Sequence, residues 1–308
     1  SENGDSELEA RATFALGQLY QYMGRTVLSQ ASFESARSLC LSMVNRDDLS
    51  NLTPWRREVA VGALDGLGTL ALDQGEGERG RRFLEEARTL AGNDDLLAAR
   101  VLTALSQDYI RQGDGDLALP LLEEARVRSE TAEDPVLYGR VLNNLGILHA
   151  EAARYDVALE LFRSALKIRE GLDYRMGAVI NLRNIGDVHM RLGDDARAWA
   201  AFKKSHELAV ASGFEHGEVM NEAYLAYLES QQGEQDSEQR LLAVLGRADR
   251  IGQHETRVNA RWFLGKFRMG QGDPEGARTA WEEGLAVAVD VESPQLAKEL
   301  RVALESLA

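Results

Sequence analysis

Basic and amide side chains recur in this sequence at intervals of about 40 residues. Arg100 and Arg140 stand 40 positions apart, and so do Asn143 and Arg183. Arginine pairs with carboxylates through two parallel hydrogen bonds, and an asparagine amide matches the donors and acceptors of a peptide main chain. If equivalent positions of a repeat lie side by side, these residues form a strip that binds an extended chain. The alternative is that the arginines pair with acidic residues of neighbouring helices, each pair contributing roughly 0 to 1 kcal/mol.

Other patterns that could carry chemistry have a simpler structural explanation. The segment 75–80, GEGERG, has the glycine spacing of dinucleotide-binding loops, but those loops follow a strand and a helix is expected here. His149 and His189 occupy equivalent positions, yet two histidines without cysteine or carboxylate partners make a poor metal site. The sequence contains no GxxxxGK[ST], HExxH or GxSxG motif. We therefore predict no catalytic residue, no metal, no cofactor and no enzymatic activity.

Composition narrows the class of partner. A net charge of −15 over 308 residues disfavours a nucleic-acid surface, which has to be basic. No run approaches the roughly 18 apolar residues of a membrane span, so no membrane partner is expected. Cys40 is the only cysteine, which favours a reducing compartment, and we expect a cytoplasmic protein. The chain begins without methionine, so we expect a segment of a longer protein, whose other parts could supply an intramolecular partner.

The elements that must position these residues are repeated helix pairs. The sequence NNLGILH, residues 143–149, is one of seven related stretches whose fourth position is small: Gly17, Gly68, Ser106, Gly146, Gly186, Ala226 and Gly265. Seven residues later comes a turn position, where a helix is expected to end: Gly24, Gly75, Gly113, Ala153, Gly193, Gly233 and Gly272. A second apolar pattern of helical period follows, opening its core-facing column with Phe33, Leu84, Leu122, Phe162, Phe202, Leu242 and Trp281. Each copy therefore predicts two antiparallel helices.

Proline positions agree with this prediction, because proline is tolerated in the first turn of a helix and disrupts its interior. Pro54, Pro135, Pro274 and Pro294 each follow a Thr, Asp or Ser that is suited to cap a helix. Pro120 is expected in the first turn of its helix. The interval from the first small residue to the second is longer than the others, and its excess around residues 45–57 predicts an elongated helix or a loop.

These residues resemble the tetratricopeptide repeat family over nearly the whole chain. The match is closest in the fourth unit, at Leu145, Gly146, His149, Ala158, Phe162 and Ala165. The spacing near 40 residues resembles the long-repeat branch found in kinesin light chains, Pins-type polarity adaptors and bacterial regulators with MalT-like sensor domains. The sixth unit departs from the pattern at Ala226, Glu229 and Glu238.

The resemblance implies an all-α fold, a right-handed superhelical solenoid of about seven antiparallel helix pairs plus a C-terminal capping helix. We expect one domain over residues 1–308. Its units are 5–50, 53–92, 94–132, 134–172, 173–213, 214–252 and 253–291, with the cap at 293–308.

The resemblance also implies a concave groove, lined by the first helices, that binds a protein or peptide partner carrying acidic residues. The candidate groove residues are Arg100, Arg140, Asn143, Asn144, Arg183, Asn184, Asp187, Tyr227, Trp262 and Lys266. We expect an interaction module in a bacterial signalling or regulatory protein. Two other roles stay open: a sensor whose superhelix changes when a small ligand or signalling peptide binds, and a scaffold for homo-oligomerisation.

Overall fold

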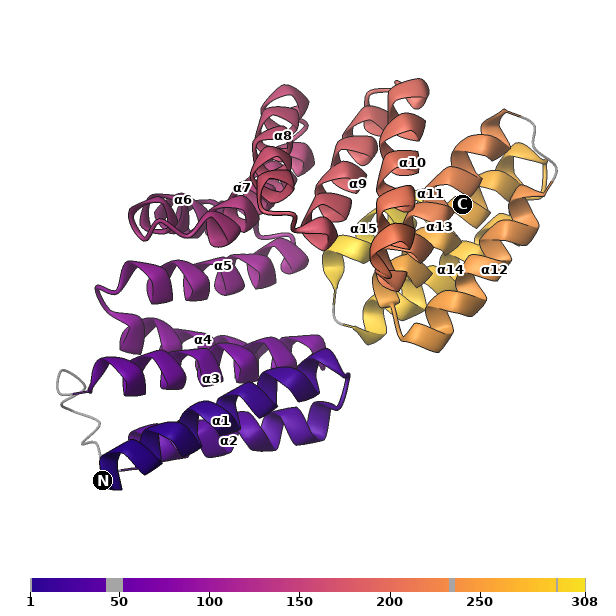
Figure 1. Ribbon diagram of the computed structural model, residues 1–308. Helices are drawn as coiled ribbons and strands as arrows, with labels where there is room; N and C mark the ends of the chain where they lie inside the picture. The colour runs from indigo at the N-terminus through magenta and orange to yellow at the C-terminus, as the bar shows by residue number, and fades with distance from the viewer. Residues whose placement is uncertain (1, 43–51, 233–235, 292, 308) are drawn as a thin grey trace. The chain divides into compact units, whose positions relative to one another are not determined.

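The computed structural model describes residues 2–42, 52–232, 236–291 and 293–307, and every regular element in these ranges is an α-helix. Figure 1 shows these helices, most of them joined by short turns. Their bounds are α1 Glu2–Tyr22, α2 Thr26–Leu41, α3 Pro54–Asp73, α4 Gly77–Ala91, α5 Asp95–Gln112, α6 Gly115–Thr131, α7 Pro135–Glu151, α8 Tyr155–Gly171, α9 Arg175–Arg191, α10 Asp195–Ser212, α11 Glu215–Gln231, α12 Ser237–Ile251, α13 His254–Gly270, α14 Pro274–Asp290 and α15 Pro294–Glu305. Each predicted unit holds one pair, and α15 is the predicted cap. The all-α prediction is confirmed.

The helices fall into two compact units. The first unit comprises residues 1–109 and 116–137, and the second comprises residues 110–115 and 138–308. Within each unit, helices adjacent in sequence pack against one another, as α3 does against α4 and α9 against α10. The expectation of one continuous domain over residues 1–308 stays a prediction.

The small residues of the first helices let each pair pack closely. A methyl group added at Gly146 would lie 2.5 Å from the ring of Phe162, and one at Gly186 would lie 2.7 Å from the ring of Phe202. Both distances are below van der Waals contact, so the aromatic rings occupy the space that a side chain would need. The small column of the first helix and the large apolar column of the second helix therefore contact each other within a pair.

The second helix of the sixth unit is shifted by one position from its predicted register. Leu242 is 47% exposed, and the neighbouring Leu241 is fully buried in the core instead. The polar departures of this unit are accommodated by ion pairs: Glu229 pairs with Arg240, and Glu238 lies 2.9 Å from Arg268. Gly233, the predicted turn residue, lies outside the described residues, as does most of the long segment after α2.

Four prolines begin their helices as predicted: Pro54, Pro135, Pro274 and Pro294. The expectation for Pro120 is wrong. Because α6 begins at Gly115, Pro120 lies in its second turn, where the helix loses the hydrogen bond that an amide at this position would donate.

The turns between paired helices use the left-handed backbone conformation, mostly at glycine. Ala153 is an exception, since its φ is +55° where the equivalent Gly193 has +73°. A Cβ atom is unfavourable there, so replacing Ala153 with glycine is expected to raise the free energy of unfolding by about 1 kcal/mol. Gly193→Ala is the reciprocal control and is expected to lower it by a similar amount in a denaturant titration. Equal stabilities for the wild type and both variants would contradict this account.

Candidate functional site

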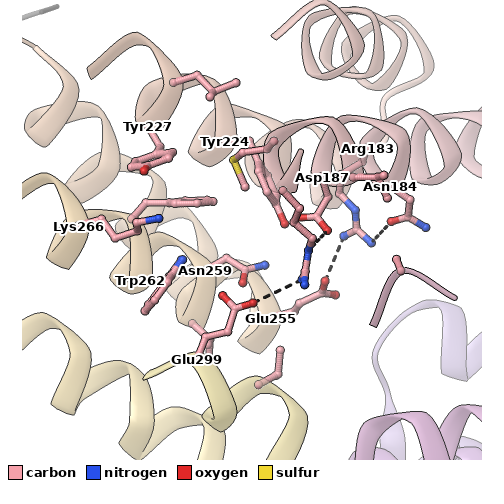
Figure 2. A pocket seen from close by; sticks show the side chains of 18 of the residues that line it. Arg183, Asn184, Asp187, Tyr224, Tyr227, Glu255, Asn259, Trp262, Lys266 and Glu299 are labelled. Carbon is pink, nitrogen blue, oxygen red and sulfur yellow. Dashed lines mark hydrogen bonds and ion pairs between the residues drawn. The ribbon is translucent and has the colours of Figure 1, made fainter. Parts of the chain in front are cut away.

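The candidate site is a cavity of about 550 Å³ within the second compact unit, which comprises residues 110–115 and 138–308. The first helices α7, α9, α11 and α13 supply most of its wall, and α15 adds Gln295, Leu296, Glu299 and Leu300. Figure 2 shows side chains from different helices converging on this space, with Tyr227 and Trp262 near Lys266 and with Asp187 near Arg183.

The repeat places equivalent residues in the cavity wall. The residue after each small position contributes Ile147, Asp187, Tyr227 and Lys266. The fifth residue after it contributes Glu151, Arg191 and Gln231 from three consecutive units. The repeats that line the cavity turn the same face of their first helices toward it. Residues at equivalent positions of these repeats therefore lie side by side in the wall.

Aromatic rings form one region of the wall. Tyr227 stacks on Phe263 with ring centroids 4.7 Å apart, and Tyr224 stacks on Phe202 at 4.4 Å. The ammonium group of Lys266 lies 5.3 Å from the ring centroids of both Tyr227 and Trp262. A cation between two rings is held by their negative faces. This region therefore offers flat apolar surfaces beside a positive charge.

Arg191 is the centre of the charged region. Its guanidinium lies 2.8 Å from Asp187 on its own helix, 3.6 Å from Glu151 on α7 and 3.4 Å from Glu299 on α15. Burial opposes the charge, but the three carboxylates outweigh it and hold the pKa of Arg191 above its ordinary value. Gln295 of α15 also donates a hydrogen bond to Glu151. These contacts tie α15 across the wall to α7 and α9.

Arg183 is the second arginine in the cavity. It lies 3.2 Å from Glu255 of α13 and donates a 3.2 Å hydrogen bond to Asn184. Burial opposes its charge, yet the nearby Glu255 raises the pKa of Arg183 above its ordinary value. Both arginines are thus neutralised by carboxylates of neighbouring helices.

Six of the ten predicted groove residues line the cavity: Arg183, Asn184, Asp187, Tyr227, Trp262 and Lys266. Three others lie on α7 outside its lining. Arg140 is exposed, whereas Asn143 and Asn144 are buried. The amide oxygen of Asn143 accepts hydrogen bonds from Asn181 at 3.0 Å and from Asn184 at 2.9 Å, which join α7 to α9.

Arg100 belongs to the first unit, where it lies 3.9 Å from Asp134 and is 46% exposed. Its predicted role in peptide binding stays a prediction, as do the roles of the other nine residues.

Several residues of the cavity were not predicted from the sequence. Glu151, Tyr224, Glu255 and Glu299 all line it. A signal for Glu151 was present, because it shares a sequence column with Arg191. Glu299 has no such signal, since it comes from the capping helix, which lies outside the repeat.

His189 is a buried ring next to the cavity wall, only 6% exposed. Burial lowers its pKa below the ordinary value of 6.5, because the charged form loses its hydration. The unfolded chain then binds a proton more readily than the folded one, so stability is complete above about pH 6.5 and falls as the pH drops below it. His189→Phe is expected to flatten this dependence between about pH 7 and 5.5 in thermal unfolding. An unchanged slope would show that another group titrates.

No group of three or more His, Cys, Asp or Glu side chains in the described ranges is arranged to hold a metal ion. None of the helices in the described part of the chain combines the length and apolar character needed to cross a membrane.

Part of this sequence is similar to known repeat proteins. The family model described as "Tetratricopeptide repeat" matches residues 109–171. The TPR repeat-containing protein PA0015 of Pseudomonas aeruginosa is 40% identical over 70 residues, which make up 20% of this chain and 67% of that protein.

Solved structures show the same fold over a larger share of the chain. The apo form of RapI is similar with a TM-score of 0.70 at 13% identity, covering 92% of this chain and 99% of that one. The Rap conjugation gene regulator of the plasmid pLS20, in complex with the Phr* peptide, has a TM-score of 0.71 at 14% identity, covering 91% and 73%.

Proposed function

Because the chain belongs to the tetratricopeptide repeat family, we propose that it is a protein-interaction module whose second unit binds a peptide segment in the described cavity. The observation that carries this proposal is the lining of the cavity, where four first helices bring equivalent residues together on one wall. A volume of about 550 Å³ falls within the usual range for ligand sites and suits a few side chains of a peptide. The peptide bound to the pLS20 regulator, a protein of similar fold, also supports it.

The aromatic region is suited to anchor such a peptide. Tyr227 and Trp262 are large side chains that lose little conformational freedom on binding, and residues of these types dominate the binding energy of many interfaces. Tyr227 is already fixed by its stacking on Phe263. A side chain inserted between these rings and the charged region would be desolvated without rearranging the helices.

The charges favour a partner segment without net negative charge. Five carboxylates line the cavity against three cations, Arg183, Arg191 and Lys266. Both arginines already have carboxylate partners, so an acidic side chain would have to displace Glu255 or Asp187. The acidic partner expected from the sequence is therefore less well supported than a neutral or basic one.

We propose binding rather than catalysis, because both arginines of the cavity are joined to carboxylates in ion pairs and the residues that line it include no Ser, Thr, Cys or His. The wider context, a bacterial signalling or regulatory protein in the cytoplasm, is part of the same proposal. It is supported by the Pseudomonas aeruginosa relative and by the similarity in fold to the pLS20 gene regulator.

One observation favours a sensor role for this module. The capping helix α15 forms part of the cavity wall and is tied to it by Glu299 and Gln295. A ligand that competed for Arg191 or Glu151 would loosen α15, so occupancy would be transmitted to the end of the chain. Faster hydrogen exchange of α15 on peptide binding would support this role, and unchanged exchange would leave a rigid binding module.

The test of peptide binding compares two tryptophans. Peptides are selected from a random phage-displayed library on the whole chain, and their Kd is measured for wild type, Trp262→Ala and Trp55→Ala. Trp55 belongs to α3 of the first unit and is half-buried, as Trp262 is. We expect Trp262→Ala to weaken binding at least tenfold, about 1.4 kcal/mol, and Trp55→Ala to leave Kd unchanged.

Because Trp262 also packs against Trp281, both variants are first checked by circular dichroism. Lys266→Met, which removes an exposed charge and keeps the packing, serves as a second cavity variant. Equal affinities for all four proteins would place the binding site elsewhere, and failure to select any peptide would overturn the proposal.

A further inference from the structure

Arg169, in the last turn of α8, is a buried cation outside the candidate site. Only 4% of the residue is exposed, and its Nη1 donates a 2.6 Å hydrogen bond to the main-chain oxygen of Gly177 in α9. Its Nε is also buried and has no hydrogen-bond partner among the described residues. A guanidinium has five N–H donors, so the bond to one carbonyl oxygen satisfies only a small part of this side chain.

The acidic residues nearest to Arg169 in sequence pair with other cations. Glu170 lies 3.3 Å from Lys204 of α10, and Asp173 lies 3.0 Å from Arg175 at the start of α9. Arg169 itself forms no ion pair in the described part of the chain. A buried charge without a partner is costly, because it loses hydration that nothing replaces.

The helices that contact α8 offer Arg169 no carboxylate. Neither residues 138–150 of α7 nor residues 175–186 of α9 include an Asp or a Glu. Burial lowers the pKa of Arg169 to about 10; the nearby Tyr174 opposes this shift, and the positive charge of Arg140 on α7 adds to it. The surroundings of the guanidinium therefore hold a second cation and, among the described residues, no anion.

The repeat shows that an arginine is not needed at this position. Arg169 comes 23 residues after Gly146, and the residues at the same place in five other units are small and fully buried: Cys40, Ala91, Ser129, Ala209 and Ala288. In this unit a glycine makes room for the larger side chain, since a Cβ atom on Gly177 would lie 2.6 Å from Cδ of Arg169. Helix packing alone therefore does not explain the arginine.

Two further donors lie on α7. Arg140 is exposed and, within the described ranges, forms no ion pair. Asn144 is 3% exposed, and its amide nitrogen Nδ2 is buried with no hydrogen-bond partner in those ranges. The two residues are four positions apart and so share one face of α7. This face therefore carries a free cation and a free amide donor, and a solute can reach it because Arg140 is exposed.

We propose that Arg169 and Arg140 bind a carboxylate group, which belongs to an acidic side chain of a partner or to a small organic acid. An arginine pairs with a carboxylate through two parallel hydrogen bonds, and the unpartnered Nε of Arg169 is a donor that can make one of them. A carboxylate also brings the single negative charge that one buried cation requires, whereas a phosphate monoester brings about one and a half to two.

This inference does not depend on peptide binding in the cavity, because neither Arg169 nor Arg140 lines it. The arginines of the cavity are already paired with carboxylates, whereas Arg169 and Arg140 are not. An acidic group therefore has a more favourable place here than in the cavity. Arg140 was among the predicted groove residues, but Arg169, which comes from a second helix, was not.

The test follows the Nε–H resonance of Arg169 by NMR in the whole chain, while sodium acetate replaces sodium chloride at constant ionic strength. Arg169→Lys assigns the resonance. Because the chain has a net charge of −15 and repels anions in general, a saturable shift reports a specific site. We expect saturation for the wild type, a Kd at least fivefold higher for Arg140→Met and an unchanged Kd for Arg100→Met. Arg100 is the matched control, since it occupies the same column in the first unit and is 46% exposed.

Thermal unfolding gives a second readout, which a purely structural role of Arg169 would not move. A ligand that binds only the folded chain stabilises it, so acetate should raise the Tm of the wild type and leave that of Arg169→Met unchanged. Arg169→Lys is the milder variant if Arg169→Met does not fold. Equal acetate-induced shifts in Tm for the wild type and the variant would overturn the proposal.

Two further titrations of the same resonance separate the sources of the anion. One uses the tripeptide glycyl-aspartyl-glycine, acetylated and amidated at its ends, and the other uses sodium phosphate. Tighter binding of the tripeptide than of acetate assigns the carboxylate to a partner's acidic side chain, and equal affinity assigns it to a small acid. A resonance that responds to neither carboxylate, or to phosphate alone, would also contradict the proposal.

Discussion

Replacing Phe202 with alanine is expected to lower the free energy of unfolding of the second unit by about 4 kcal/mol. The ring is fully buried, fills the space beside Gly186 and stacks on Tyr224 with centroids 4.4 Å apart. Its removal leaves a cavity where α9, α10 and α11 meet. The loss is measured by urea unfolding followed by circular dichroism, with hydrogen exchange used to assign it to these helices.

Gly186 supplies the matched control for Phe202. In the wild type, Gly186→Ala places a methyl group 2.7 Å from the ring and is expected to destabilise the unit by about 2 kcal/mol. In the Phe202→Ala background the space is empty, so the same substitution should be nearly neutral. Additive effects of the two substitutions would contradict a direct contact between the columns.

This pair shows what the sequence could predict. A small residue in one helix and a large apolar residue 16 positions later recur with the repeat, and the structure brings Gly186 and Phe202 of these two columns together. The same recurrence put Asp187, Tyr227 and Lys266 in one sequence column, and all three line the cavity wall. Their role in peptide binding stays a prediction. Features that repeat with the unit are predictable because every unit packs in the same way.

Features that do not repeat were missed. Glu255 pairs with Arg183 from 72 residues away, and its partner depends on the direction of two long side chains. Asn143 is polar, so it was expected to face a partner peptide, but it is 5% exposed and joins α7 to α9 through hydrogen bonds with other asparagines. The capping helix was predicted, yet nothing in its sequence shows that Glu299 enters a cavity.

Replacing Arg191 with methionine is expected to destabilise the second unit by about 2 kcal/mol at neutral pH. Methionine keeps much of the packing volume but leaves Asp187, Glu151 and Glu299 together without their shared cation. The value is lower than for a fully buried ion pair, because Arg191 is 31% and Glu299 51% exposed and water screens part of the repulsion. Urea unfolding of the variant and of the wild type measures it.

The salt dependence separates this electrostatic effect from a packing effect. Added salt screens the repulsion among the three carboxylates, so the difference between wild type and Arg191→Met should shrink. Arg197→Met is the control, because this arginine is 74% exposed and pairs with Asp194 on the surface, and we expect it to change stability by less than about 0.5 kcal/mol.

The helices that the Arg191→Met substitution destabilises connect stability with the proposed function. Since Arg191 is the ion-pair partner of Glu299, its loss should speed hydrogen exchange in α15 as well as in α9, although the two helices are about a hundred residues apart in the sequence. A loss confined to α9 would mean that Glu299 contributes little to holding the cap. Faster exchange in both helices would show that the charge at the centre of the cavity controls the helix that closes it, which is the coupling that a sensor would need.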